Sequence, residues 1–373
     1  MDALHGTERV EIAIIGGGQA GLATGYFLKE RDRPFVILDA GERVGDAWRT
    51  RWESLRLFTP ARFDSLPGFP FPGSNWSFPT KDEMAAYLEA YVERFDLPVR
   101  TGVTVERLEK DGDRFVITTS RGRFEADNVV VATGACQTPK APGFADQLRP
   151  DIRQLHSKDY QSPSQLRDGD VLVVGVGNSG AEISTELSTT RRTMLAGKES
   201  GHIPARHGSL TYRPGFRVFR FIGHRVLTRG TPIGRKLAPK LFAHGDPLVR
   251  VRPKDLAAAG IERVPRVAGV RDGLPLLEDG RALDVANVIW CTGFRSDFGW
   301  IDLPILGDDG EPVHDRGVVG SVPGLYFIGL AFQYSLSSDV LPGMSRDHAF
   351  IANHIASHRP SMSEASAELD PVT

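Results

Sequence analysis

Short, uninterrupted runs of apolar residues recur along the chain, and two of them lead into glycine-rich turns followed by helix-forming sequence. The first covers residues 10–15 and ends in GGGQAG at 16–21, and the second covers 171–174 and ends in GVGNSG at 175–180. Runs of this kind, rich in Val and Ile, are typical of strands buried on both faces of a parallel sheet. Further runs occupy 35–38, 128–134, 193–195, 287–290 and 325–329. The pattern predicts an α/β fold.

The stretches between these runs follow other patterns. Thr80 and Glu83 form a capping box, which predicts an amphipathic helix that ends near Phe95. Residues 99–125 alternate in short runs separated by glycines, as in a three-stranded antiparallel meander. Residues 66–79 are too rich in proline for regular structure. Residues 141–168 show no clear period, and we interpret them as a linker between domains.

Three glycines in the first repeat have the spacing of a dinucleotide-binding turn. Gly16 permits the tight turn, Gly18 lets the backbone approach a pyrophosphate, and Gly21 lets the following helix pack on the strand. The N-terminus of that helix, with Gln19 and Ala20, would face the phosphates.

An acidic residue ends the next strand of the first repeat. Asp39 lies 18 positions after Gly21, where a carboxylate can accept both ribose hydroxyls of an adenosine. A glycine motif alone is weak evidence, because glycine turns between strand and helix are common. Here the strand, turn, helix, second strand and acid occur in the order of a nucleotide-binding unit. We therefore predict a dinucleotide site, the alternative being a bare strand, turn and helix.

The second repeat has the same glycine spacing at an offset of 159 residues. Gly175, Gly177 and Gly180 correspond to the three glycines of the first turn, and Asn178 and Ser179 open the predicted helix. The second turn is therefore predicted to bind a second dinucleotide through the same backbone groups.

The two repeats differ in charge at the end of their second strand. Carried from Asp39, the same offset leads to Lys198, with Arg191 and Arg192 expected nearby. A carboxylate suits a free 2′-hydroxyl, as in FAD or NAD, whereas a cation suits the 2′-phosphate of NADP. We predict FAD in the first site and NADPH in the second, with NADH tolerated because Lys lacks the fork of Arg. The alternative is that Lys198 is a solvated charge at a strand end.

Paired Thr-Gly dipeptides repeat at the same offset of 159 residues. Thr133 and Gly134 follow one apolar run, and Thr292 and Gly293 follow another. We expect these turns to mark two crossings between two Rossmann-like dinucleotide-binding domains, with the NADPH domain inserted into the FAD domain. The expected division is 1–165 and 286–358 for FAD and 166–285 for NADPH, with a disordered polar tail at 359–373.

Composition limits the classes of partner. The 373 residues are 40% hydrophobic and 25% charged, with a net charge of −2, which favours neither nucleic acid nor membrane insertion. Two cysteines, Cys136 and Cys291, make no CxxC pair, and the histidines show no metal-binding spacing, so we predict no metal. With neither a signal peptide pattern nor a long apolar run, we expect a cytoplasmic protein, and a homodimer stays open.

Residues 198–254 are strongly basic and contain interleaved aromatic side chains. Such a segment is typical of a membrane-surface or nucleic-acid patch. It is equally typical of an amphipathic helical cap over an active site, with its arginines in water. The neutral balance of the whole chain favours the cap.

Several motifs together resemble the flavin-containing monooxygenase family (class B flavoprotein monooxygenases), and within it the short CzcO-like and YUCCA-like members. They are GGGQAG at 16–21, Gly45-x-x-Trp48 with Arg49, LRLFTPARFDSLPGFPFP at 55–72, VATG at 131–134 with Pro139, GVGNSGAE at 175–182, WCTGF at 290–294 and Gly343-x-x-Arg346-Asp347. The resemblance implies that Trp48, Val105, Thr133, Gly134 and Gly329 add to the FAD site, and Thr292 and Gly293 to the NADPH site.

The match has local departures. The family fingerprint F-x-G-x-x-x-H-x-x-x-(Y/F) is matched by His156 and Tyr160, whereas Pro150 and Ile152 stand at its Phe and Gly positions. Phe58 stands at the position of the active-site asparagine of animal-type members. The YUCCA-like branch is therefore the closer model.

The resemblance implies an enzyme that reduces FAD with NADPH, forms a C4a-hydroperoxyflavin with O₂ and oxygenates a small nucleophile such as an amine, a sulfide or an enolisable carbonyl. Because the cofactor carries this chemistry, no catalytic side chain is assigned. Two alternatives stay open: an NAD(P)H oxidase or reductase with uncoupled flavin, and a flavoprotein that only binds nucleotides.

Overall fold

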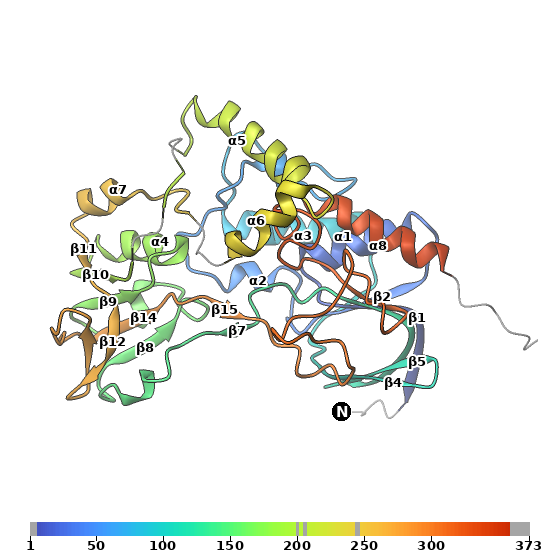
Figure 1. Cartoon of the computed structure of the whole chain (residues 1–373), viewed down its shortest axis with the longest axis horizontal. Helices are drawn as coiled ribbons and strands as arrows, with labels where there is room; N and C mark the ends of the chain where they lie inside the picture. The colour runs from blue at the N-terminus through green and yellow to red at the C-terminus, as the bar shows by residue number, and fades with distance from the viewer. Residues whose placement is uncertain (1–5, 199–200, 204–206, 243–246, 359–373) are drawn as a thin grey trace, which may run out of the picture.

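Two sheets, one mixed and one parallel throughout, form two lobes that are joined by a narrow pair of chain crossings (Figure 1). The structure, a computed structural model, describes residues 6–198, 201–203, 207–242 and 247–358. The predicted disordered tail at 359–373 lies outside the described residues. The expected α/β class with two Rossmann-like sheets is confirmed.

The first sheet combines a parallel part with an antiparallel meander. Its strand order is β3-β2-β1-β6-β5-β4, with β16 also paired to β6. The strands are β1 (Thr7–Ile15), β2 (Phe35–Leu38), β3 (Val99–Arg100), β4 (Val105–Asp111), β5 (Arg114–Thr119), β6 (Gly122–Val131) and β16 (Leu325–Phe327).

The expected separation of the meander from the apolar run at 128–134 is wrong, because one long strand, β6, serves both. Its first half pairs antiparallel with β5, and its second half pairs parallel with β16, while β1 runs parallel along its length. The strand continues because the alternating pattern passes into the apolar run with neither Gly nor Pro between them.

The second sheet is parallel throughout, in the order β11-β10-β9-β14-β8. It contains β8 (Arg153–His156), β9 (Val171–Val174), β10 (Thr193–Ala196), β11 (Glu262–Val264) and β14 (Asn287–Trp290). A small hairpin, β12 (Val267–Arg271) and β13 (Leu274–Leu277), follows β11.

Two strands of this sheet lie outside the range 166–285 that the sequence suggested for it. The expectation of a plain linker at 141–168 is wrong at β8, because RQLH forms an edge strand too short and polar to show as an apolar run. On the other side, β14 extends the sheet beyond 285. The chain crosses between the lobes at β7 (Thr138–Pro139) and β15 (Phe294–Arg295), which pair antiparallel at the centre of Figure 1.

Helices cover one face of the first sheet. α1 (Gln19–Lys29) packs against α3 (Lys81–Phe95) and α8 (Ser345–Ser357), and the core between them includes Leu22, Leu88 and Ile351. The predicted capping box of α3 is present: the Thr80 hydroxyl accepts from the Glu83 amide, and the Glu83 carboxylate accepts from the Thr80 amide. A short helix, α2 (Asp46–Arg49), contacts α3.

In the second lobe, α4 (Asn178–Leu187) packs on β9 and β10, and α7 (Pro253–Ala258) contacts α4. Single 3₁₀ turns occupy Ala61–Phe63, Ala145–Gln147 and Pro163–Gln165. Between β10 and α7, the chain leaves the second lobe and forms α5 (Tyr212–Phe221), a π-helical turn (Ile222–Val226) and α6 (Pro232–Phe242), which lie above the helices of the first lobe (Figure 1).

Candidate active site

The first glycine turn has the geometry of a backbone cradle. Gly16 has φ +111°, and a Cβ there would lie 2.5 Å from the carbonyl oxygen of Ala132. A Cβ on Gly21 would lie 1.9 Å from the Gly16 oxygen, so both positions require glycine. A Cβ on Gly18 would meet nothing within 4 Å. The open side at Gly18 faces away from the protein where α1 begins, and this space fits a pyrophosphate at the helix N-terminus.

The second turn repeats this geometry closely. Gly175 has φ +113°, and its Cβ would lie 2.2 Å from the Cys291 oxygen, while a Cβ on Gly180 would lie 1.9 Å from the Gly175 oxygen. Gly177 is open like Gly18, and the two N-cap residues have φ, ψ of −76°, −176° and −75°, −175°. Neither helix has an acidic residue in its first turn, so both N-termini suit an anion.

Asp39 stands at the end of β2 beside the first turn. One carboxylate oxygen accepts from the Gly17 amide, and the other accepts from the Gly41 amide at 2.7 Å. These bonds orient the carboxylate, and each oxygen retains a lone pair for a ribose hydroxyl.

Three other residues expected at the FAD site differ in what they contact: two contact residues of the first turn, and one contacts the core. Trp48, on α2, donates from Nε1 to Gln19 Oε1 at 3.3 Å. Gly329, which follows β16, faces Ala20, since a Cβ on it would lie 3.5 Å from that of Ala20. Val105 opens β4 and is half-buried in an apolar cluster on the sheet, so its contact is with the core.

Strand register corrects the predicted equivalence of Asp39 and Lys198. In the first sheet Ile15 pairs with Leu38, and in the second Val174 pairs with Ala196. The structural counterpart of Asp39 is therefore Gly197, and Lys198 lies one position later. The ungapped offset is wrong here because α4, with 10 residues, is one residue shorter than α1, with 11.

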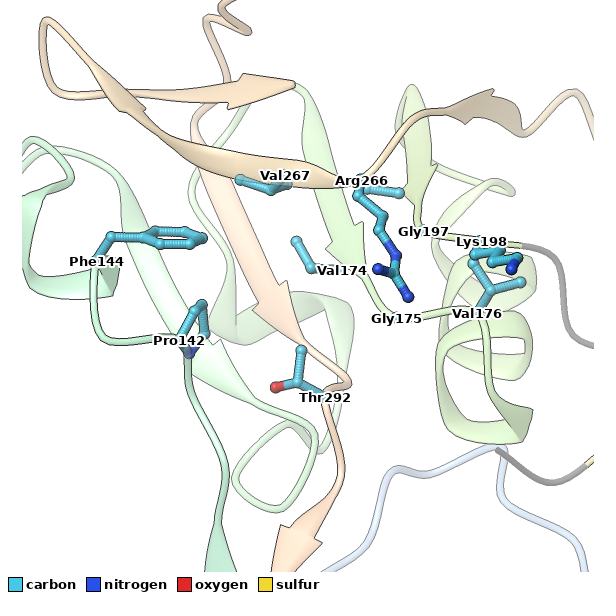
Figure 2. A pocket seen from close by; sticks show the side chains of 11 residues that line it. Pro142, Phe144, Val174, Gly175, Val176, Gly197, Lys198, Arg266, Val267 and Thr292 are labelled. Carbon is cyan, nitrogen blue, oxygen red and sulfur yellow. The ribbon is translucent and has the colours of Figure 1, made fainter. Parts of the chain in front are cut away.

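A cavity of about 330 Å³ opens at the second turn (Figure 2). It is lined by Gly175, Gly197, Lys198 and Thr292, with Pro142 and Phe144 on the opposite wall. With glycine in place of the acid, no carboxylate projects from that strand end. Gly197 has φ +138°, and a Cβ there would lie 2.9 Å from Cγ2 of Val176, so this position favours glycine.

Arg266 also lines this cavity, and the sequence reasoning missed it. Figure 2 shows its guanidinium directed toward Gly175, on the wall that Lys198 shares. It lies in the loop after β11, two residues beyond Val264. No motif marks a lone Arg 68 positions after Lys198, and only the pairing of β11 with β10 brings the two together.

Other residues expected at the NADPH site have structural partners. Asn178 holds the 247–249 segment, accepting from the Val249 amide and donating to the Pro247 oxygen. Ser179 lies half-buried in the first turn of α4. The expectation that Arg191 and Arg192 add charge near Lys198 is wrong, because they precede β10 at its other end. There Arg191 donates to the backbone oxygens of Arg167 and Pro163. Arg192 forms ion pairs with the carboxylates of Asp170 and Glu262.

The two Thr-Gly turns meet at the crossing between the lobes. Gln137 donates to Thr133 Oγ1 and the Gly134 oxygen, and its own oxygen accepts from the Asp297 amide at 2.7 Å. In the second turn, the Thr292 hydroxyl donates to the Lys140 oxygen. The Gly293 oxygen accepts from the Lys140 amide at 3.0 Å.

The fingerprint residues support this crossing. His156 Nε2 donates to the Gly293 oxygen at 3.1 Å, and burial lowers the pKa of His156. Tyr160 is fully buried, and its hydroxyl donates to Glu186 on α4. Both positions therefore act in the packing of the second lobe.

The proline-rich loop at 55–80 is covered by α5. The Phe58 carbonyl oxygen accepts from the Tyr212 hydroxyl at 2.9 Å and from His207 Nε2 at 3.1 Å. Phe63 packs against Phe216, with ring centroids 5.1 Å apart. The loop that precedes α8 is bound by α5, through Arg220 to the Pro342 oxygen, and by the segment after α5, through Arg229 to the Phe332 oxygen.

A buried acid lies under this cover. Asp64 is fully buried, its Oδ1 accepts from the Thr59 hydroxyl, and its Oδ2 has no hydrogen-bond partner. Burial raises the pKa of Asp64 to about 8, with the Thr59 hydrogen bond acting in the opposite direction. The loop thus holds a carboxyl that is protonated at neutral pH.

Neither cysteine is paired: Cys136 is exposed and Cys291 is half-buried. Within the described ranges, no group of three or more His, Cys, Asp or Glu side chains could hold a metal ion. Among the helices that the structure describes, none has both the length and the apolar character that crossing a membrane requires.

The model of the pyridine nucleotide-disulphide oxidoreductase family matches residues 13–209. A CzcO-like oxidoreductase of Geobacillus kaustophilus is 40% identical over 94% of this chain and 99% of its own length. A flavin-containing monooxygenase of Stenotrophomonas maltophilia is 30% identical, and its structure matches with a TM-score of 0.73 over 94% of this chain and 99% of that chain. The chain belongs to the flavin-containing monooxygenase family.

The indole-3-pyruvate monooxygenase YUCCA1 of rice is also similar, at 35% identity over 88% of this chain and 89% of its own length. As a flavin-containing monooxygenase, the protein is a flavin-dependent oxidoreductase that uses NAD(P)H, O₂ and a small-molecule substrate.

Proposed function

We propose that this monooxygenase binds FAD at the first glycine turn and NADPH at the second, and transfers one oxygen atom of O₂ to a small, soft nucleophile. The observation that carries the cofactor assignment is the contrast between two matching turns. One has Asp39 at the strand end, and the other has Gly197 there, with Lys198 and Arg266 in the adjoining cavity.

At the first turn, the open backbone at Gly18 and the N-terminus of α1 would bind the pyrophosphate of FAD, and Asp39 would accept the ribose hydroxyls. Trp48 and Gln19, hydrogen-bonded to each other, would form the adjoining wall. The residues therefore fit an adenosine with a free 2′-hydroxyl.

At the second turn, Lys198 and Arg266 would hold the 2′-phosphate of NADPH. Arg supplies a planar fork for a phosphate, which Lys alone lacks. Phe144 offers a flat surface for the adenine within the same cavity. Because Arg266 lies in this wall, the site should bind NADPH in preference to NADH.

Bound flavin, once reduced by the nicotinamide, supplies the activation of O₂. The protein's part is to exclude water from the reaction. The 55–80 loop, α5 and the segment before α8 are tied together by Tyr212, Arg220 and Arg229, and these ties form a cover. A neutral Asp64 adds no charge to the underside of that cover at neutral pH.

The substrate class that we propose is a small amine, sulfide or enolisable carbonyl. The name of the rice relative, an indole-3-pyruvate monooxygenase, supports testing an enolisable 2-oxo acid first. The similarity of 35% over most of both chains makes this class the best starting point.

The decisive test is stopped-flow absorbance after reduced enzyme, with NADP⁺ bound, is mixed with O₂. We expect an absorbing species that differs from both reduced and oxidised flavin, and whose decay is accelerated by an oxidisable substrate, with oxygenated product equal to the NADPH consumed. Direct return to oxidised flavin with stoichiometric hydrogen peroxide would contradict the proposal and indicate an NAD(P)H oxidase.

A further inference from the structure

The outer face of α5 and the π-helical turn is apolar although it faces solvent. Val218, Phe221 and Ile222 lie at helical positions i, i+3 and i+4, and 58%, 61% and 40% of their surface is exposed. The opposite face, with Tyr212 and Phe216, packs on the 55–80 loop. The helix therefore presents two apolar faces, of which only one is covered.

Two further apolar side chains, one before and one after α5, are also exposed. Leu210 is 80% exposed, and Ile233, at the start of α6, is 55% exposed. Seven of the ten large hydrophobic side chains that stand exposed among the described residues lie between 210 and 237. A concentration of this kind marks an interaction surface, because scattered single residues are the normal pattern.

The same segment is entirely basic. Residues 207–242 contain eight Lys and Arg and no Asp or Glu. Since the whole chain has a net charge of −2 and this segment has +8, the rest of the chain carries −10. This segment is thus strongly positive against a negative remainder of the chain, and α5 lies at the upper edge of the molecule in Figure 1.

Some of these cationic side chains make contacts within the protein. Arg213 and Arg217 lie over the Trp76 ring, at 5.4 and 5.6 Å, and Arg220 binds the Pro342 oxygen. Arg225 and Lys236 are exposed beside the apolar face. They stand in the same surface as Phe221 and Ile233, so that charge and apolar area coincide.

We propose that this segment docks on the surface of an anionic phospholipid bilayer through its exposed apolar and basic side chains. These are Leu210, Val218, Phe219, Phe221, Ile222, Arg225, Ile233 and Lys236. Exposed aromatic and aliphatic side chains with Lys and Arg around them are the combination that an interfacial helix uses. The docking is shallow, because none of the described helices can span a bilayer.

Two other occupants fit this surface less well. A second copy of the chain, meeting this face with the same face, would bring two segments of charge +8 together with no acidic residue in either. A nucleic acid would match the charge, but Val218, Ile222 and Ile233 have no ring with which to stack a base. The lipid surface satisfies both the charge and the aliphatic area.

The test is co-sedimentation of the full-length holoenzyme with vesicles. With phosphatidylcholine vesicles containing about 30 mol% phosphatidylglycerol, at about 0.1 M salt, we expect at least roughly tenfold stronger partitioning than with phosphatidylcholine alone. Raising the salt to about 0.5 M should weaken the anionic binding, because the charge term is screened.

Two double variants separate the contributions of apolar area and charge. Phe221→Ser with Ile222→Ser, and Arg225→Gln with Lys236→Gln, should each lower partitioning by roughly tenfold or more. Leu306→Ser removes a side chain that is 45% exposed outside the segment and is the matched control, expected to bind like the parent. All variants should retain flavin and the basal rate of NADPH oxidation, because these side chains are exposed to solvent and make none of the contacts that hold the cover.

Equal binding to neutral and anionic vesicles would overturn the proposal, as would full binding by either double variant. Concentration-dependent dimerisation that the Phe221 and Ile222 double variant abolishes would assign the face to a second copy instead. Binding of single-stranded DNA that exceeds vesicle binding and is lost in the Arg225 and Lys236 double variant would assign it to nucleic acid.

Discussion

The two glycine turns have nearly the same backbone and different surroundings. Gly18 and Gly177 agree within 1° in both φ and ψ, and the glycines on either side meet the same backbone atoms at nearly the same distances. Around this shared frame, Asp39 in the first site is replaced by Gly197 in the second. The shared backbone fits a pyrophosphate in both sites, and the side chains at the strand ends are what distinguishes the two sites.

The strands next to β2 and β10, which are β3 and β11, extend this comparison. The Asp39 amide bonds to the Arg100 oxygen at the end of β3, and the Gly197 amide bonds to the Val264 oxygen at the end of β11. Two residues further on, the first site has Gly102 and the second has Arg266. At these two structurally matched positions, the second site therefore has glycine where the first has an acid, and a cation where the first has glycine.

The largest effect is expected from Gly21→Ala. Its Cβ would lie 1.9 Å from the Gly16 oxygen, a backbone atom that cannot move without opening the turn. We expect a loss of about 3 kcal/mol or more in the free energy of unfolding, together with loss of bound flavin. Urea denaturation and the flavin absorbance of the purified protein measure the two effects.

Gly18→Ala is the matched control, because a Cβ there meets nothing within 4 Å. It should fold with parental stability and bind flavin more weakly, since the methyl group enters the space for the pyrophosphate. Equal unfolding free energies for the two variants would refute the clash.

The next effect in size concerns the choice of coenzyme. Lys198→Ala with Arg266→Ala removes both cations from the cavity wall. We expect KM for NADPH to rise roughly 100-fold and KM for NADH to change by less than about threefold, because only NADPH carries the 2′-phosphate. Steady-state kinetics with both coenzymes make the measurement.

Arg192→Ala serves as its control, because this Arg lies at the far end of β10 and pairs with Asp170 and Glu262. It should leave the ratio of the two KM values unchanged. An equal loss with NADPH and NADH in the cavity variant would mean that the two cations do not contact the 2′-phosphate.

A buried carboxyl in the first lobe should make the stability of the protein depend on pH. The pKa of Asp64 is raised to about 8 by burial, whereas in the unfolded chain an Asp titrates near about 4. Between these values the folded state holds a proton that the unfolded state releases. The contribution of Asp64 to stability therefore falls as the pH rises through this range, and stays low above pH 8.

The substitution Asp64→Asn keeps the shape of the side chain and removes its ionisable carboxyl. It should stabilise the protein relative to the parent at pH 9 and make less difference at pH 5, as measured by urea unfolding at both values. Asp113→Asn, an exposed acid in a turn, is the control and should give the same difference at both pH values. A flat difference for Asp64→Asn would refute the raised pKa.

Local sequence was sufficient wherever a feature depends on neighbouring residues. The two glycine turns, the capping box at Thr80 and Glu83, and the buried runs at 35–38 and 171–174 were all predictable, because their spacing alone dictates the backbone. The edge strand β8 was not, since its four residues are ordered by pairing with β14 and carry no period of their own.

By itself, the sequence determined the two glycine turns and the paired Thr-Gly turns beside the crossing between the lobes, because glycine spacing and apolar runs are local properties. Tertiary structure decided that Gly197, and not Lys198, matches Asp39, and that Arg266 joins Lys198 in one cavity. It also decided that the outer face of α5 stays uncovered. Each of these depends on strand register or on packing between segments far apart in the chain, and no count along the sequence contains that information.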